Sequence, residues 1–218
     1  MKEKDLVNIL NDYIESKKII YGNEIRMGIG IPDIMICSEM LKKESLITDY
    51  YALKIYDYIN KKKVDNIEEI TKKVSMSKKN ICKYIYELKE KNILEFEKDK
   101  IEVLKNLDLQ DIGTNISIEV KLKDWKNGIL QAKRYLRFSD YSYLAILEQY
   151  QKNIDLDELK NSGIGLIVVG DKIKQVIKPK KSKQCDKYFK YISISSLLNK
   201  RNIDDNIEFN SNNLLSIW

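Results

Sequence analysis

The order of hydrophobic and polar residues divides the chain into segments with helical spacing and segments that alternate like strands. Between residues 4 and 16, large apolar side chains recur every three or four positions, which predicts an amphipathic helix. Two extended segments follow, at about 18–27 and 33–37, and the glycines of Gly28-Ile29-Gly30 supply the turn between them. The chain is therefore expected to open with a helix and two strands.

The clearest strand lies at residues 116–122, where apolar and polar side chains alternate without a break. Successive side chains of a strand point to opposite faces, so the apolar members share one face and the polar members share the other. The polar face carries Ser117, Glu119 and Lys121. Residues two apart on one strand face stand about 7 Å apart at the backbone. Glu119 and Lys121 can therefore point at one small site.

The same patterns predict the rest of the second half of the chain. A helix is expected at about 127–138, a strand at 141–147, a helix at about 154–161, and strands at 165–169 and 172–177. A further helix is indicated around residues 188–192, and residues 210–213 read as a loop. Strands that alternate with helices indicate an α/β fold.

About eighty residues separate the second extended segment from the strand at 116–122, far more than a hairpin loop needs. Three short helical patterns fill this gap, and Ser77 is a plausible N-cap for the third of them. Two short strands follow at about 93–104, around the turn Lys98-Asp99-Lys100. The order helix, helix, helix, hairpin predicts a small inserted unit at residues 46–105.

Composition limits the class of protein. With 218 residues, of which 43% are apolar and 33% charged, the chain can bury one core plus a small module. No apolar run is long enough to span a bilayer, and no signal peptide is evident. Three cysteines, without metal-ligand spacing, argue against a disulfide framework. We therefore expect a cytoplasmic protein without a membrane partner.

Charge and residue types narrow the chemistry. The net charge of +6 mildly favours a polyanionic partner. The chain contains no histidine, so histidine-based triads, general bases and metal sites are excluded. Any catalysis must use carboxylates, lysine, hydroxyl groups or a bound metal.

Two carboxylates and a lysine are the groups that such chemistry needs. Asp33 opens an apolar run, and Glu119 and Lys121 lie on one strand face. Carboxylates that converge at a sheet edge can hold a hard divalent cation for phosphodiester hydrolysis, and a lysine can orient water or offset developing charge. Taken singly, Glu119 and Lys121 also fit an ordinary surface ion pair, and Asp33 also fits a turn residue after proline.

The sequence Pro32-Asp33, followed by Glu119-Val120-Lys121, resembles the motif of the PD-(D/E)xK nuclease superfamily. Gln131 and Tyr135, one helical turn apart, resemble the QxxxY helix that follows this motif in its RecB-like branch. The resemblance implies a restriction-endonuclease-like core, a mixed sheet flanked by helices, at residues 1–45 and 106–218.

The resemblance also implies roles for individual residues. Asp33, Glu119 and the carbonyl of Val120 would hold Mg²⁺ or Mn²⁺, and Lys121 would position water or stabilise the transition state. Gln131 and Tyr135 would face the metal and the nucleic acid strand; a helix surface where Tyr135 only covers the core is the other interpretation. Glu24 is the candidate for a further acidic residue, and an exposed strand residue is its alternative.

The segment from Met76 to Leu94 resembles the recognition helix of winged helix-turn-helix domains, with Asn92 where glycine is usual. This resemblance implies contacts to DNA from the start of that helix. The candidates are Ser77, Lys78, Lys79, Asn80 and Lys83. A solvated lysine-rich face and a protein-docking module remain the alternatives.

The hypothesis from sequence is a Mg²⁺- or Mn²⁺-dependent deoxyribonuclease that an inserted winged helix directs to duplex DNA. Homodimerisation is expected from the resemblance alone. The alternative is a non-catalytic DNA-binding regulator built on a nuclease-like scaffold. A protein-interaction module without nucleic acid contacts is the third interpretation.

Overall fold

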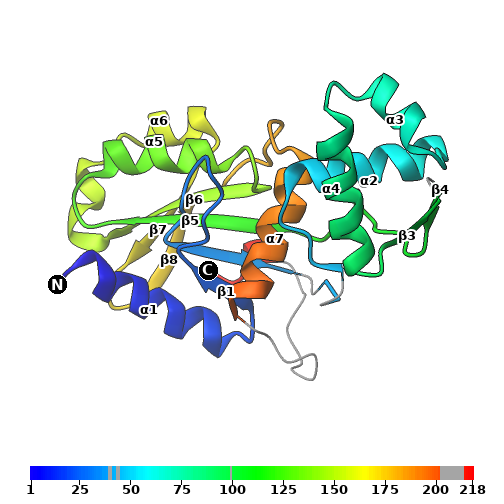
Figure 1. Ribbon diagram of the computed structural model, residues 1–218. Helices are drawn as coiled ribbons and strands as arrows, with labels where there is room; N and C mark the ends of the chain where they lie inside the picture. The colour runs from blue at the N-terminus through cyan, green and yellow to red at the C-terminus, as the bar shows by residue number, and fades with distance from the viewer. Residues whose placement is uncertain (39–40, 43–44, 99, 202–213) are drawn as a thin grey trace.

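A six-stranded mixed sheet forms the centre of the larger part of the structure (Figure 1). The computed structural model describes residues 1–38, 41–42, 45–98, 100–201 and 214–218. The strands lie in the order β1-β2-β5-β6-β7-β8. Their bounds are β1 Ile20–Asn23, β2 Ile34–Cys37, β5 Asn115–Lys121, β6 Tyr141–Leu147, β7 Gly165–Val169 and β8 Ile173–Ile177.

The pairing is antiparallel at both edges and parallel in the middle. β1 with β2, β2 with β5, and β7 with β8 run antiparallel, whereas β5 with β6 and β6 with β7 run parallel. A mixed α/β fold is thereby confirmed. The two motifs lie on neighbouring strands, because Ile34 of β2 pairs with Ile118 of β5.

Helices cover both faces of this sheet (Figure 1). On one face, α1 (Glu3–Ser16) buries Leu6, Leu10 and Ile14 against the apolar side of β5. On the other face, α5 (Trp125–Tyr135) and α6 (Leu156–Ser162) pack on β6 and β7, and Ile129 belongs to that buried cluster. α7 (Lys187–Arg201) contacts β1. Short 3-10 helices form η2 (Glu148–Asn153) and η3 (Leu214–Ser216), and Leu214 of η3 is buried in the cluster under α1.

Several expected boundaries are corrected. The extended segment 18–27 shortens to Ile20–Asn23, because Lys18 and Glu24 have φ values of 55° and 50° and interrupt the extended backbone. The helix expected at 127–138 begins earlier and ends at Tyr135, and the helix expected at 154–161 begins at Leu156, after the turn of η2. The loop expected at 210–213 lies outside the described residues.

The middle of the chain forms three helices and a hairpin, in the expected order. Their bounds are α2 Tyr50–Lys62, α3 Ile67–Lys73, α4 Lys78–Glu90, β3 Leu94–Glu97 and β4 Lys100–Val103. The Ser77 hydroxyl accepts the Asn80 N–H and caps α4, and Asn92 has the left-handed φ of 53°. These two local expectations are confirmed, whereas the winged-helix assignment stays a prediction.

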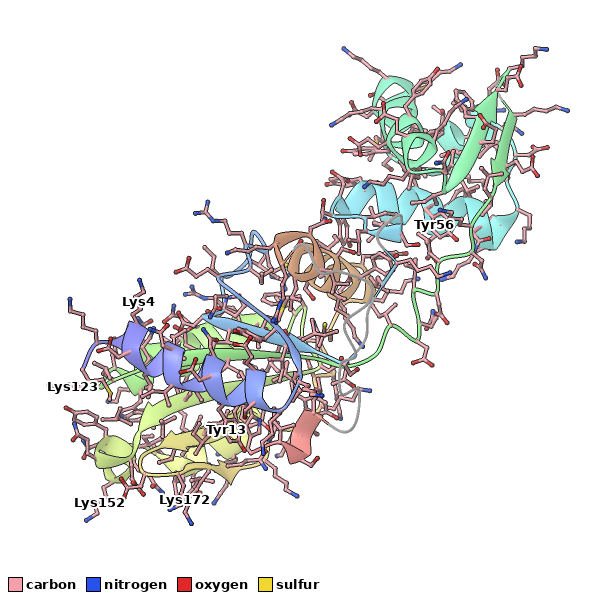
Figure 2. The ribbon with its side chains drawn as sticks, turned by 90° about the horizontal axis from the view of Figure 1, so that it is seen from below. Lys4, Tyr13, Tyr56, Lys123, Lys152 and Lys172 are labelled. Carbon is pink, nitrogen blue, oxygen red and sulfur yellow. The ribbon has the colours of Figure 1, made fainter. Side chains whose placement is uncertain are left out.

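This inserted unit extends to one side of the sheet, and α2 is its element nearest the core (Figure 2). A single buried cluster joins the two parts, since Leu53 and Ile85 of the insert belong to it together with Tyr191 and Leu197 of α7. The Tyr50 ring also stacks on Phe189 at 4.6 Å between centroids. The insert therefore shares its apolar core with α7. Among the described helices, none has the length and apolar character that crossing a bilayer requires.

The packing of Gly165 against Tyr143 gives a first prediction. A Cβ at position 165 would lie 2.4 Å from the Tyr143 ring, which is fully buried. Gly165→Ala is therefore expected to lower the free energy of unfolding by about 1–3 kcal/mol, measured by urea denaturation. In a Tyr143→Leu background the same substitution should cost less. An equal loss in both backgrounds would show that the clash is not the cause.

Candidate active site

Asp33 lies where β2 begins and its carboxylate continues the pairing with β5. The Asp33 Oδ2 atom accepts a hydrogen bond of 2.7 Å from the Val120 N–H. The pairing of β2 with β5 begins at Ile34, the first residue of β2, which lies opposite Ile118. At the preceding residue, Asp33, a side-chain oxygen accepts the β5 N–H in place of a backbone carbonyl. Asp33 is therefore fixed one residue beyond the ladder, beside Glu119.

Glu119 lies on the polar face of β5, and this face is buried. Glu119 is 1% exposed and Ser117 is completely buried, so the interpretation as an exposed strand face is wrong. The covering element is α5, which packs on β5 and β6. A carboxylate in this position must find partners inside the protein.

Two donors supply those partners. The Lys121 Nζ atom donates to Glu119 Oε1 at 2.5 Å, and the Tyr135 hydroxyl donates to Glu119 Oε2 at 2.5 Å. The Tyr135 hydroxyl also lies 2.9 Å from the Ile31 carbonyl oxygen. Side chains from β5 and α5 and the loop before Asp33 thus meet at a single carboxylate.

Two glycines make this meeting possible. A Cβ on Gly30 would lie 2.7 Å from the Tyr135 ring, and a Cβ on Gly128 would lie 2.9 Å from Cγ of Lys121. Both values are shorter than a carbon–carbon contact allows. The loop and the helix therefore approach the site closely because these positions lack a side chain.

The two carboxylates influence each other's protonation. Burial raises the pKa of Glu119, and the negative charge of Asp33 raises it further. Burial also raises the pKa of Asp33, although the hydrogen bond from Val120 and the charge of Lys121 act in the opposite direction. The two carboxylates therefore repel each other when both are ionised, and a nearby cation would reduce this repulsion.

The two donors remain protonated. Burial lowers the pKa of Lys121, but the hydrogen bond to Glu119 and the charges of both carboxylates outweigh it, so the net shift is upward. Burial and the bond to Glu119 raise the pKa of Tyr135. Lys121 is therefore an ammonium group and Tyr135 a neutral donor at neutral pH.

Glu3, at the start of α1, is a member of the site that the sequence did not single out. Its Oε1 atom accepts the Leu122 N–H at 3.3 Å, and its Oε2 atom lies 4.0 Å from the Lys121 Nζ atom. Its side chain is 49% exposed. An acidic residue in the first turn of a helix is common, because it interacts favourably with the helix dipole. Only the packing of α1 on β5 distinguishes Glu3 from other acidic residues.

Within the described parts of the chain, the side chains of Glu24 and Gln131 form no hydrogen bond to Asp33 or Glu119. Glu24 is exposed and follows the end of β1; its N–H donates to the Asp33 carbonyl at 3.3 Å, and its charge raises the pKa of Asp33. Gln131 lies one turn before Tyr135 on α5, and its buried Oε1 atom has no hydrogen-bond partner among the described residues. Both roles stay predictions.

The donor set fits a hard divalent cation with an incomplete protein shell. Asp33, Glu119 and the Val120 carbonyl offer oxygen atoms, and Mg²⁺ commonly binds one or two carboxylates and keeps several water ligands. Over the described ranges of the chain, no three Asp, Glu or Cys side chains form a group that could hold a metal. A cation here would therefore depend on two carboxylates whose mutual repulsion it relieves.

The candidate DNA contacts lie at the start of α4, on the surface of the insert. Lys78, Lys79 and Asn80 are exposed. Ser77 is occupied as the N-cap, and Lys83 lies 3.8 Å from Glu87 and covers the Tyr84 ring. All five candidates are therefore exposed, and Lys78, Lys79 and Asn80 lie in the first turn of the helix.

Comparison of the chain with protein-family models, curated proteins and solved structures finds no match. Function is accordingly inferred from the arrangement of the side chains.

The raised carboxylate pKa values give a second prediction. Asp33 and Glu119 bind protons more tightly in the folded chain than in the unfolded chain, so their contribution to stability is complete below about pH 4 and is lost as the pH rises through their native-state values. In metal-free buffer, the free energy of unfolding from urea titrations is expected to fall over this interval. Asp33→Asn removes one titrating group and one repulsive charge, so the fall should be smaller. The same pH dependence in both proteins would contradict the assignment.

Proposed function

We propose that the chain is a metal-dependent nuclease that hydrolyses DNA phosphodiester bonds. The observation that carries the proposal is the convergence of Asp33, Glu119 and Lys121 at one end of β2 and β5, with Glu119 buried and its charge opposed by Asp33. Structural ion pairs rarely bring two carboxylates together at such a cost. Catalytic sites do so in order to hold a cation.

The residues would divide the work as follows. Asp33, Glu119 and the Val120 carbonyl would hold Mg²⁺ or Mn²⁺, which supplies an activated water and neutralises charge on the phosphate when it is bound. Lys121 carries its positive charge next to these ligands and would orient the attacking water or offset negative charge in the transition state. Tyr135 keeps the Glu119 carboxylate in one orientation.

The topology supports a restriction-endonuclease-like core. A helix leads into the antiparallel strands β1, β2 and β5, and a helix then connects β5 to its parallel neighbour β6. The carboxylates lie on β5 and at the start of β2, as the resemblance to the PD-(D/E)xK superfamily implies.

The insert would bind the duplex. Three helices followed by a hairpin, with α4 packed on α2 and α3, are the arrangement of a winged helix-turn-helix unit. Lys78, Lys79 and Asn80 would then contact DNA from the first turn of α4, with the lysines at phosphates.

One observation favours a second candidate, a DNA-binding regulator that does not cleave. Both oxygens of Glu119 are already bonded, one to Lys121 and one to Tyr135. If these bonds persist when a cation is present, Glu119 can share an oxygen with the metal only weakly. The regulator predicts duplex binding without a metal requirement.

The nuclease is tested by cleavage of plasmid and linear DNA with Mg²⁺ or Mn²⁺. Asp33→Asn, Glu119→Gln and Lys121→Met are each expected to reduce the cleavage rate by roughly a hundredfold or more, because each removes a group that acts on the metal, water or phosphate. Asp12→Asn and Lys17→Gln, which change exposed charges near the C-terminal end of α1, far from Glu3, should cleave normally.

Full activity in the Asp33 and Lys121 variants would refute the mechanism. Absence of cleavage by the native chain with either metal, together with tight binding of duplex DNA, would support the regulator.

The insert gives a separate prediction. Lys78→Gln/Lys79→Gln is expected to weaken duplex binding and to reduce the dependence of the logarithm of affinity on the logarithm of salt concentration by about one unit per lysine. Fluorescence anisotropy with a labelled duplex at several salt concentrations measures both quantities. Lys17→Gln/Lys172→Gln removes the same charge at exposed positions outside the insert and serves as the control. An equal effect of both pairs would place the DNA elsewhere.

A further inference from the structure

A cavity of about 470 Å³ lies where α2, the turn between α3 and α4, and α7 meet. Its wall combines residues of the insert with Tyr188, which belongs to α7. None of the groups discussed for metal binding or cleavage lines it. Its size falls within the usual range of about 300–1,000 Å³ for small-molecule sites.

The wall is strongly basic. Four lysines line it, Lys54, Lys61, Lys62 and Lys73, against one carboxylate, Asp57. Like charges on a concave wall repel one another in the free protein and attract an anion. The position of these lysines therefore favours an anionic occupant.

Asp57 does not cancel this preference, because its carboxylate is already paired with other groups of the protein. Its Oδ2 atom accepts hydrogen bonds of 2.7 Å from both Lys187 Nζ and the Tyr188 hydroxyl, and Lys61 Nζ lies 3.0 Å away. Two ammonium groups thus share one carboxylate. The surplus positive charge is available to a ligand.

The rest of the wall is apolar and aromatic. Tyr51, Tyr58 and Tyr188 contribute rings, and Ile55 and Met76 contribute aliphatic surface. The Tyr51 side chain is among the exposed large hydrophobic residues of the structure, at 51%. Such walls bind planar rings by stacking, whatever the ring substituents.

This character follows from a second face of α2. Tyr51, Lys54, Tyr58 and Lys62 are spaced three, four and four residues apart, so they share one face of the helix. The opposite face carries the fully buried residues of the core, among them Leu53. One face of α2 packs in the core, and the second face is aromatic and basic. Folding does not require this second face, which is therefore available for binding.

We propose that this cavity binds a free nucleotide, with the phosphates on the lysines and the base against the tyrosine rings. A nucleotide would contact both the lysines and the tyrosine rings, whereas a bare phosphate would contact only the lysines and an uncharged nucleoside only the rings. The bound nucleotide would touch α2, the α3–α4 turn and α7 together. It would therefore strengthen the contact between the insert and the core next to the start of α4.

The test is isothermal titration calorimetry of the full chain with ATP, GTP, CTP and UTP in EDTA, which removes any contribution of a metal at Asp33. At least one nucleotide is expected to bind about tenfold or more tightly than tripolyphosphate, and its nucleoside should bind far more weakly. If none of the four binds more tightly than tripolyphosphate, the proposal is wrong. The result is independent of cleavage, so the two proposals fail separately.

Variants locate the site. Lys62→Gln/Lys73→Gln is expected to weaken nucleotide binding by about tenfold, and Tyr51→Leu should weaken nucleotide binding while leaving tripolyphosphate binding unchanged. Lys72→Gln/Lys91→Gln removes the same charge from exposed positions outside the cavity and should bind normally.

Two results would overturn the assignment to this cavity. One is an equal loss of binding in both lysine pairs, which would indicate general charge attraction. The other is binding of short duplex DNA, but of no nucleotide, that depends on Lys62 and Lys73. Urea denaturation of each variant establishes that it is folded before binding is compared.

Discussion

The burial of the Glu119 carboxylate is the constraint on which the rest of the site depends. Removing a carboxylate from water costs several kcal/mol unless charged or hydrogen-bonded partners replace the water. Here the partners are Lys121, two residues along the same strand, and Tyr135, on the helix that covers it. Strand, helix and the loop before Asp33 must all be in place before Glu119 can be buried, so the site forms only in the folded core.

A second consequence of this burial is the need for space around the partners. Lys121 and Tyr135 reach Glu119 by passing close to the backbone of α5 and of the loop before Asp33. Gly128 and Gly30 stand at these two crossings, where a Cβ would lie 2.9 Å from Lys121 and 2.7 Å from Tyr135. Neither glycine has a positive φ, so what the structure requires at these positions is the absence of a Cβ; a Cβ on Gly128 would also lie 2.7 Å from the Leu144 side chain.

The sequence predicted those features that depend on local periodicity. The alternation at 116–122 located β5, and the spacing of Gln131 and Tyr135 placed them on one helix face. The sequence did not indicate which face of β5 another element would cover. A charged strand face is usually exposed, and Glu119 is buried only because α5 returns across β5. Glu3 was missed for the same reason: its position near Lys121 results from the packing of α1, far away in sequence.

The position of the insert also follows from strand pairing. Cys37 at the end of β2 faces Asn115 at the start of β5, so the chain leaves the sheet and returns to it at adjacent points. An antiparallel pair accepts a long insertion at such a point without any change of register, because loop closure becomes only slightly costlier with length.

Asp33 and Glu119 lie at the other end of the same strand pair, about four residues or roughly 13 Å away along the strands. The insert therefore does not form part of the carboxylate site, and Figure 2 shows it on the far side of the molecule from Lys4 and Lys123. If the insert holds a duplex that the core cleaves, the duplex must span this distance. The orientation of the insert is then as important as its affinity, and it is fixed by α7, whose Lys187 and Tyr188 bind Asp57 of α2. Changes at that contact would alter the orientation of the insert while leaving the carboxylate site intact.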